Sequence, residues 1–223
     1  MALLEIEGLH KRYGETIALQ EIDLLLRCIN GLEVIQGGKI RLQEQGVLGQ
    51  DIDWTAARQH IGMVFQSYEL FAHLNVIDNI LLAPFKVQKR RREDVEAEAD
   101  RWLERVGLLS RKYAYPRELS GGQKQRIAIV RALCMNPDIL LLDEITAALD
   151  PEMVREVLDV ALGLAREGMS MLIVTHEMGF AEKVADRILF MDGGRIIEEN
   201  RPQSFFIRPQ SERARQFLNG LTY

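Results

Sequence analysis

The chain has 223 residues, of which 47% are hydrophobic and 27% charged, a composition typical of a globular protein. Its net charge of -5 argues against the basic surface that nucleic-acid-binding proteins need. We therefore expect no nucleic-acid partner. The expected organisation is one domain, residues 1–223, that includes a helical lobe over residues 67–118.

The first half of the chain is expected to contain strands and then helices. Apolar residues at mostly even spacing predict two short strands within residues 3–24, around a polar turn. Further strands are expected at 39–43 and 61–66. Residues 75–109 place apolar side chains at helical spacing. The basic run 89–92 is interpreted as the solvated start of a helix, in preference to a phosphate contact.

From residue 120 onward, short apolar strands alternate with helices. Such alternation indicates βαβ units and a mainly parallel sheet with helices on both faces. The predicted fold class is α/β, with a mainly parallel central sheet, an N-terminal antiparallel β region and a helical subdomain. The expected elements are helix 121–135, strand 139–142, helix 151–167, strand 171–175, helix 177–185 and strand 187–191.

Cysteine usage and the amino-terminal residues predict the compartment. Cys28 and Cys134 lie in apolar, helix-like stretches without metal-site spacing, which is typical of reduced thiols in the cytosol. Glu5 and Glu7 would fall inside the apolar core of a signal peptide, so secretion is not expected. Charged residues interrupt every apolar run before it reaches the ~18 residues of a spanning helix. Any role at a membrane is therefore expected to come through partner subunits.

The string LSGGQ, Leu119–Gln123, directly precedes an apolar helix. Ser120 is expected to cap this helix, with Gly121 and Gly122 in its first turn. The free amides and the helix dipole favour an anion there, and glycines allow it to approach the backbone. For Ser-Gly-Gly alone, a plain capped helix is the simpler interpretation. The full string, running into Gln-Arg and an apolar helix, is more specific.

Polar side chains follow three of the predicted strands. Ile139–Leu142 is continuously apolar, as in a strand buried on both faces, and Asp143 and Glu144 follow at its carboxyl end. Ligands bind at that edge of parallel sheets, and paired acids there suit Mg2+ and a water nucleophile. Asp143 would hold the metal and Glu144 would orient or deprotonate the attacking water. Gln66 and His176 follow two other strands, although a lone histidine at a strand end is more often structural.

Taken in order, these segments resemble the ABC ATPases, a family with a P-loop NTPase-like fold, over essentially the whole chain. The resemblance implies that Tyr13 stacks on adenine and that Gln66 contacts both the nucleotide and the metal. It also implies that Leu119–Gln123 is the signature motif, which binds the ATP of a partner subunit. The implied cofactors are ATP and Mg2+.

The same resemblance assigns the residues that would carry out hydrolysis. Asp143 would be the magnesium ligand, Glu144 the catalytic carboxylate and His176 the histidine that contacts the terminal phosphate. Asp150 would end the D-loop that begins at Ala147 and would contact the nucleotide. The implied activity is an ATPase coupled to transport.

Within this family, the stretches LLRCINGLE, THEMGFAEKVADRILFMDGGRIIEE and PQSERARQFL look like the importers of polar amino acids. The implied assembly is a homodimer or a pseudo-symmetric dimer that joins membrane-spanning permease subunits and works indirectly with a substrate-binding protein. Its place would be peripheral, at the cytoplasmic face of the cell membrane. The apolar side chains after Gln66 would either dock the permease or pack the helical lobe, and both interpretations stand: Tyr68, Leu70, Phe71 and Leu74.

One expected element is missing, because no GxxxxGK[ST] motif occurs in the chain. Near residues 24–27 an early strand runs directly into what resembles the later part of a helix, so about twenty residues are absent, namely a strand, its turn and the P-loop. Either the sequence as written omits this segment, or the protein itself lacks it. The first explanation is favoured, because deleting a buried central strand would leave backbone groups of its neighbours unpaired.

Two other functions remain as alternatives. A degenerate subunit would hydrolyse nothing and would lend its LSGGQ motif to an intact partner. An ABC ATPase of DNA repair or translation would be expected to carry a long heptad insertion, a second cassette or a basic stripe, and the sequence has none of these.

Overall fold

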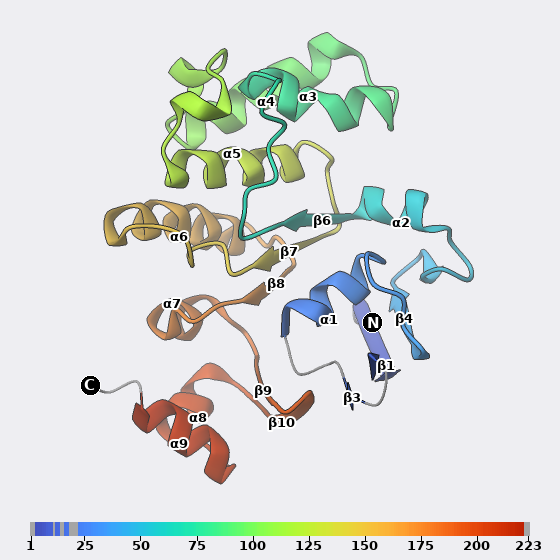
Figure 1. Cartoon of the computed structure of the whole chain (residues 1–223), viewed down its shortest axis with the longest axis vertical. Helices are drawn as coiled ribbons and strands as arrows, with labels where there is room; N and C mark the ends of the chain where they lie inside the picture. Colours follow the sequence, from blue (N-terminus) through green and yellow to red (C-terminus); the bar gives the residue numbers. More distant parts are fainter. Residues whose placement is uncertain (1–2, 11, 14–15, 18–21, 221–223) are drawn as a thin grey trace. The chain divides into compact units, whose positions relative to one another are not determined.

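The computed structural model of the chain describes residues 3–10, 12–13, 16–17 and 22–220. The chain forms two compact units, drawn in Figure 1. The first unit combines residues 1–51 with residues 175–223, and the second unit comprises residues 52–174.

The first unit begins with antiparallel strands, as predicted. Strand β4 (Gly37–Leu42) pairs with β1 (Leu4–His10) on one side and with β5 (Gly46–Val47) on the other. A separate ladder joins β2 (Arg12–Tyr13) to β3 (Thr16–Ile17). The loop before β4 is not followed by a helix, so no P-loop-like turn forms there.

The prediction of a strand that reaches Leu24 is wrong. Helix α1 spans Ile22–Ile29 and buries Leu26, Cys28 and Ile29 completely. Three consecutive leucines fit a period of two as well as a helical period, and leucine has a high helix propensity. The even spacing read from this stretch was therefore not evidence for a strand.

The other part of the first unit is a hairpin followed by two helices. Strand β9 (Ile188–Asp192) pairs antiparallel with β10 (Arg195–Asn200), and α7 (Met178–Val184) precedes them. Helices α8 (Pro202–Ile207) and α9 (Glu212–Gly220) follow. The buried Glu198 carboxylate accepts hydrogen bonds from the amides of Gln210 and Ser211, at 2.9 and 2.8 Å. These bonds fasten the start of α9 to the hairpin.

The second unit contains the predicted parallel sheet, in the order β6-β7-β8. Its strands are Ile61–Val64, Ile139–Asp143 and Met171–Val174. Every residue of β7 is buried, as expected for a central strand with apolar side chains on both faces. Every residue of β8 is half-buried, and among the described residues β8 pairs with β7 alone. The apolar strand β8 thus has one edge without a neighbouring strand in the described part of the chain.

Helices flank this sheet and form a layered stack. Helix α5 (Gly121–Leu133) contacts β6 on one side and helices α3 (Val76–Lys86) and α4 (Arg92–Arg105) on the other (Figure 1). Helices α2 (Trp54–His60) and α6 (Pro151–Arg166) and the short helices η1 (Leu109–Arg111) and η2 (Pro116–Glu118) complete the unit. The core between α3 and α4 also includes Ile127 and Val130 of α5 and its C-cap residue, Cys134. The helices of residues 67–118 therefore share one apolar core with α5.

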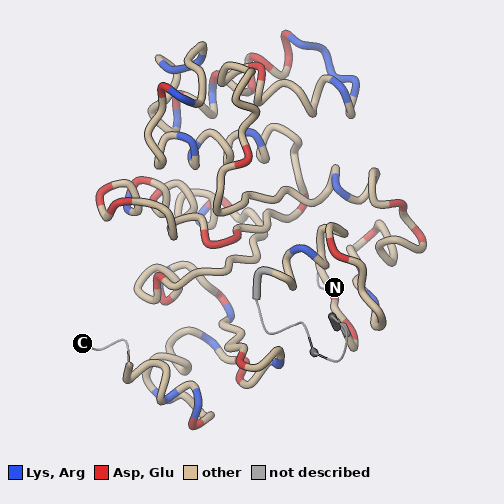
Figure 2. The backbone as a smooth tube through the Cα atoms, viewed as in Figure 1, with Lys and Arg blue, Asp and Glu red and all other residues tan. Residues whose placement is uncertain are grey.

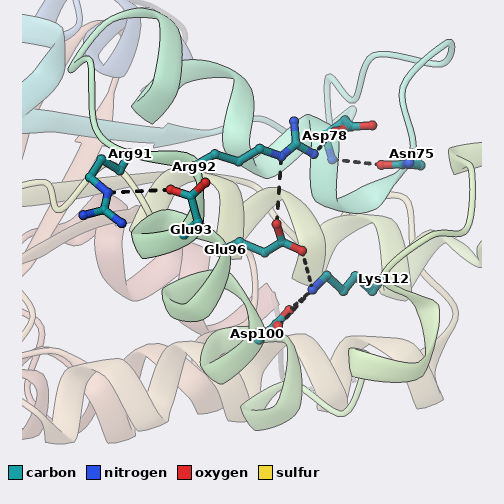
Figure 3. Close-up of polar contacts among 8 residues, drawn as sticks. All are labelled: Asn75, Asp78, Arg91, Arg92, Glu93, Glu96, Asp100 and Lys112. Atoms are coloured by element: carbon teal, nitrogen blue, oxygen red, sulfur yellow. Dashed lines mark hydrogen bonds and ion pairs between the residues drawn. The ribbon is translucent and has the colours of Figure 1, made fainter.

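Ion pairs join α3 to α4, and α4 to Lys112, which directly follows η1 (Figure 3). Lys112 lies 2.8 Å from both Glu96 and Asp100, and Arg92 lies 2.8 Å from Asp78. Although burial opposes the charge on Lys112, the hydrogen bonds that Lys112 donates to Asp100 and Glu96 outweigh this effect and raise the pKa of its ammonium group. Lys112 therefore stays protonated at every ordinary pH.

The basic run 89–92 behaves in two ways. Figure 2 shows its positive charges gathered in the connection from α3 to α4. Arg91 and Arg92 are exposed at the start of α4, as predicted for a solvated helix end. Arg90 differs, because its guanidinium is half-buried, pairs with Glu98 and donates a 2.9 Å hydrogen bond to the carbonyl of Cys134 at the end of α5. One residue of the run thus caps a neighbouring helix.

Candidate nucleotide site

Three of the predicted site residues lie at one edge of the parallel sheet. Asp143 is the last residue of β7 and is only 5% exposed, and Glu144 follows it. Gln66 comes two residues after the end of β6 and is exposed. In the register of these strands Val64 faces Leu142, so the chain segments that carry Gln66, Asp143 and Glu144 leave the sheet at the same edge.

Glu144 has a left-handed backbone conformation, with φ of 43°. Such a conformation costs a residue with a side chain about 1–2 kcal/mol, so surrounding contacts must hold it. Two hydrogen bonds do so: the Glu144 amide donates to the carbonyl of Val174 in β8, and the amide of Ala147 donates to the carbonyl of Glu144, each at 3.0 Å. The turn fixes the point at which this half-buried carboxylate leaves the sheet.

Helix α5 begins as the sequence predicted, with Ser120 as its N-cap. The amide of Gln123 donates to the Ser120 hydroxyl at 3.3 Å, and the amide of Ser120 donates to the side-chain oxygen of Gln123 at 3.0 Å. These reciprocal bonds form a capping box. Both side chains are therefore engaged with the first turn of their own helix.

The two glycines of LSGGQ are tightly surrounded. A Cβ atom at Gly121 would lie 2.9 Å from the Tyr68 hydroxyl, and one at Gly122 would lie 2.9 Å from the Cβ atom of Met153. The amide of Gly122 also lies 3.4 Å from the Met153 sulfur. In this structure the glycines make room for side chains of the same chain, whereas the sequence pattern indicated room for an anion. In this conformation Gly122 of the LSGGQ segment is packed against Met153 of α6.

The remaining predicted residues are distributed over both units. Asp150 is the exposed N-cap residue of α6, and its carbonyl accepts from the amide of Val154 at 2.9 Å. His176 belongs to the first unit, is exposed, and follows the end of β8 by two residues. The backbone of Tyr13 pairs with Thr16, but its side chain lies outside the described residues. Unit 2 thus holds the sheet-edge residues and LSGGQ, and unit 1 holds Tyr13 and His176.

The sheet edge fits a magnesium ion that arrives with a nucleotide. Among the residues that the structure describes, no three His, Cys, Asp or Glu side chains gather as a metal-binding group. Asp143 offers a buried carboxylate, and Gln66 an amide oxygen. Magnesium is commonly held by one or two such oxygens together with waters and substrate phosphates. The donor set therefore suits Mg2+ bound to ATP better than a resident metal.

Sequence reasoning missed the residues that shape the loop after β6. Gln125 and Arg131 of α5 donate hydrogen bonds to carbonyls of residues 65, 68 and 69, and Asn79 of α3 bonds the segment 71–75. A sequence signal was present only for Asn79, which lies within the mainly apolar stretch 76–82, whereas Gln125 is flanked by Lys124 and Arg126; both side chains are fully or almost fully buried. Buried polar side chains need hydrogen-bond partners, and here the partners are loop carbonyls.

In the part of the chain that the structure describes, no helix is both long and apolar enough to cross a membrane. The helices all lie within the two compact units, and none provides a spanning segment of the ~20 residues that a bilayer requires.

Known proteins resemble the chain in sequence and in fold. The glutamate transport ATP-binding protein GluA of Corynebacterium glutamicum is 47% identical over 236 residues, which covers 97% of this chain and 98% of GluA. The glutamate/aspartate import ATP-binding protein GltL of Escherichia coli K12 is 51% identical over 194 residues, covering 87% of this chain and 80% of GltL. A dimeric ATP-binding cassette, MJ0796 with ADP and phosphate, superimposes with a TM-score of 0.74 at 25% identity, covering 89% and 98% of the two chains.

The lengths of these alignments bear on the missing segment. The GluA alignment has 236 positions, more than the 223 residues of this chain, so GluA contains residues that this chain lacks. The 194 positions shared with GltL are themselves 87% of 223 residues, which leaves no insertion in that alignment. The segment missing relative to GluA therefore falls outside the part shared with GltL.

The sequence profile of the ABC transporter family matches residues 24–147, which is more than half of the chain. The matched range contains the sheet-edge residues Gln66, Asp143 and Glu144 and the whole of LSGGQ. The relatives, the parallel sheet and the order of the motifs agree with this match, and the chain belongs to the ABC transporter family, among its ATPase subunits.

Proposed function

We propose that this chain is the ATP-binding and ATP-hydrolysing subunit that powers an importer of polar amino acids. The observation that carries the proposal is the sheet edge at which Gln66, Asp143 and Glu144 leave parallel neighbouring strands. The names of GluA and GltL, which describe transport of glutamate and aspartate, support the substrate class.

Each residue at this edge has a distinct chemical task. ATP with Mg2+ supplies a terminal phosphoryl group that water can attack. Asp143 and Gln66 offer oxygen ligands to the metal. Glu144 orients the attacking water and accepts its proton, and its fixed left-handed turn limits the positions that the carboxylate can reach. His176 contacts the terminal phosphate and Tyr13 stacks on the adenine, as the resemblance implies.

The working unit in this proposal is a dimer arranged head to tail. Leu119–Gln123 of one copy completes the nucleotide site of the other, and Asp150 lies in the loop that links the two sites. The dimeric state of MJ0796, which holds ADP and phosphate, supports this arrangement. Because Ser120 and Gln123 bond with each other in the single chain, nucleotide binding by a partner would compete with their capping box.

The loop after Gln66 is the proposed contact with the permease subunits. Of its four apolar residues, Leu70 packs against the core of the helical lobe, which favours a structural role for that residue. Phe71 is 45% exposed and contacts only the edge of His73 among the described aromatic rings, so it is the side chain offered for docking. This contact would place the chain at the cytoplasmic face of the membrane.

A charged substitution tests the docking contact. Phe71→Asp should reduce assembly with the permease and transport-coupled hydrolysis, while hydrolysis by the isolated subunit is retained. Phe85→Asp is the matched control, because Phe85 is 48% exposed and lies outside this loop. Equal losses in the two variants, or no loss in Phe71→Asp, would show that Phe71 is not a docking residue.

The missing P-loop segment remains an open prediction about this function. The half-buried apolar strand β8, which pairs on one edge alone among the described residues, supports the loss of a neighbouring strand from the sequence as written. The intact mass of the natural protein distinguishes the two explanations. A mass of 25.5 kDa means that the protein lacks the segment. A mass larger by roughly 2 kDa means that the sequence omits it.

Nucleotide binding by the purified natural protein tests the proposed function. We expect magnesium-ATP to bind at micromolar concentration. The relatives, which are ATP-binding proteins by name, give no support to the degenerate alternative. A protein that binds no nucleotide alone, yet stimulates hydrolysis when mixed with an intact ABC subunit, would overturn the proposal in favour of that alternative.

A further inference from the structure

The segment that carries Gln66 adopts an unusual backbone conformation. We call residues 65–69 the Gln66 loop. Tyr68 and Glu69, which follow each other, both have left-handed backbones, with φ of 64° and 50°. Neither is a glycine or an asparagine, and the conformation costs about 1–2 kcal/mol for each such residue. Two strained residues in sequence persist only when the contacts around them hold their conformation.

Bonds within the Gln66 loop supply part of that support. The amide of Tyr68 donates to the carbonyl of Phe65 at 3.3 Å, and the amide of Glu69 donates to the carbonyl of Ser67 at 2.7 Å. The Ser67 hydroxyl also donates to the Glu69 carboxylate at 2.8 Å. All three are short-range bonds on a segment whose residues Gln66, Ser67 and Glu69 are exposed, so water competes for the same groups.

The decisive contact comes from the far end of α5. The guanidinium of Arg131 donates through one nitrogen to the carbonyl of Glu69, at 2.5 Å, and through the other to the carbonyl of Tyr68, at 3.1 Å. One rigid fork thus holds the carbonyls of both left-handed residues. Hydrogen bonds from a charged donor are about twice as strong as neutral ones, and the planar fork loses little freedom in forming two.

Helix α5 touches the loop at two further places. Gln125, which is fully buried, donates from its side-chain amide to the carbonyl of Phe65 at 3.2 Å. The Tyr68 hydroxyl lies only 2.9 Å from the position that a Cβ atom at Gly121 would occupy, so it packs closely against the first turn of α5. Gln66 therefore sits between a residue fixed by Gln125 and a residue fixed by Arg131. The helix that begins with LSGGQ holds both sides of the loop.

The surroundings of Arg131 indicate a role in holding the backbone. Burial lowers the pKa of this guanidinium, and the Glu69 carboxylate partly offsets that effect. An arginine in this position remains charged, so its two carbonyl bonds compensate part of the cost of removing it from water. Lysine, with a single ammonium group on a flexible stem, could not present two donors in a fixed plane.

We propose that Arg131 is a positioning residue, which sets the conformation of the Gln66 loop and so the place of Gln66 at the sheet edge. The role of Gln66 in metal and nucleotide binding rests on the proposed function. The conformation of the loop does not depend on it. Movement of α5 would also move the loop, because the same helix carries LSGGQ at its start and Arg131 near its end.

Hydrogen-exchange mass spectrometry on the full chain tests the structural half of this inference. In Arg131→Lys and Arg131→Gln, amide exchange in peptides covering residues 66–70 should become at least tenfold faster, with Arg131→Gln the more affected. Peptides of β7 should exchange as before. Arg90→Lys is the matched control, because Arg90 also donates to a backbone carbonyl, that of Cys134, and its other partner is Glu98 of α4 and not the Gln66 loop. Unchanged exchange at 66–70 in both Arg131 variants would overturn the proposal.

The magnesium dependence of ATP hydrolysis tests the functional half. Arg131→Lys should raise the magnesium concentration needed for half-maximal turnover, in the same direction as Gln66→Ala, and the double variant should resemble Gln66→Ala alone. A loop that exchanges faster while magnesium dependence stays unchanged would contradict positioning of Gln66. Failure of the proposed function would look different, because the unaltered protein would then show no turnover at all.

Discussion

Asn79 offers a sharp test of how the loop that presents Phe71 is built. Its side chain is 1% exposed, accepts from the amide of Phe71 at 2.8 Å, and donates toward the carbonyls of Phe71, Leu74 and Asn75 at 3.1, 3.0 and 2.9 Å. Asn79→Ala removes this whole set. If two to three of these hydrogen bonds each contribute a net ~1 kcal/mol, Asn79→Ala should lower the free energy of unfolding by about 2–3 kcal/mol.

Urea unfolding of the full chain, followed by circular dichroism, measures this loss. Asn75→Ala is the control, because Asn75 caps α3 through one 2.9 Å bond from the amide of Asp78 and should cost about 1 kcal/mol. We expect a lower unfolding midpoint for Asn79→Ala than for Asn75→Ala, with equal slopes. If Asn79→Ala cost no more than the cap variant, the loop would not depend on this amide, and the account of its order would be refuted.

Three further predictions concern buried charge, thiols and the lobe. Burial alone would raise the pKa of Glu198, but the amides of Gln210 and Ser211 outweigh it and lower the pKa below its usual 4.5. Glu198→Gln should therefore lower the free energy of unfolding by about 1–2 kcal/mol at neutral pH. This difference from the unaltered protein should shrink as the pH falls below 4.5, because the carboxylate then becomes protonated. A difference in unfolding free energy that stayed constant down to pH 3 would contradict this prediction. Burial and the charge of Glu98 raise the pKa of the Cys134 thiol to about 12, so Cys134 in the folded protein should resist alkylation that goes to completion in urea, and rapid labelling of the native chain would disprove its burial. Lys112→Met should loosen η1 from α4, because it removes the ion pairs to Glu96 and Asp100. We expect faster proteolysis near residues 109–118 in this variant. An unchanged rate of proteolysis there would contradict the prediction.

Much of the second unit follows from local sequence pattern. The continuously apolar run of β7 is typical of a strand buried on both faces, and Ser120 with Gln123 three residues later is a capping box in sequence and in structure. Helix α5 ends two residues before its predicted end. Patterns with a strong period and a clear cap specify such elements because few other arrangements satisfy both burial and hydrogen bonding.

The features that escaped prediction depend on contacts between distant residues. Nothing in Tyr68-Glu69 indicates two left-handed residues, since their conformation is held by Arg131, which lies 62 residues further along the chain. The sequence predicts a solvated run that includes Arg90, whereas in the structure Arg90 caps α5 through the carbonyl of Cys134. The consecutive leucines of α1 fit the period of a strand and that of a helix equally, so their spacing could not distinguish the two. Local pattern cannot reveal a side chain whose partner is a backbone carbonyl elsewhere in the fold.

Turnover of magnesium-ATP by the purified natural protein, compared with its Glu144→Gln variant, tests the central claim most directly. The variant keeps the size of the side chain and removes its ability to accept a proton, so we predict a loss of about 100-fold or more in hydrolysis with nucleotide binding retained. Hydrolysis at an undiminished rate in Glu144→Gln, or absence of turnover in the unaltered protein, would contradict the assignment of this chain's sheet edge as a site of ATP hydrolysis.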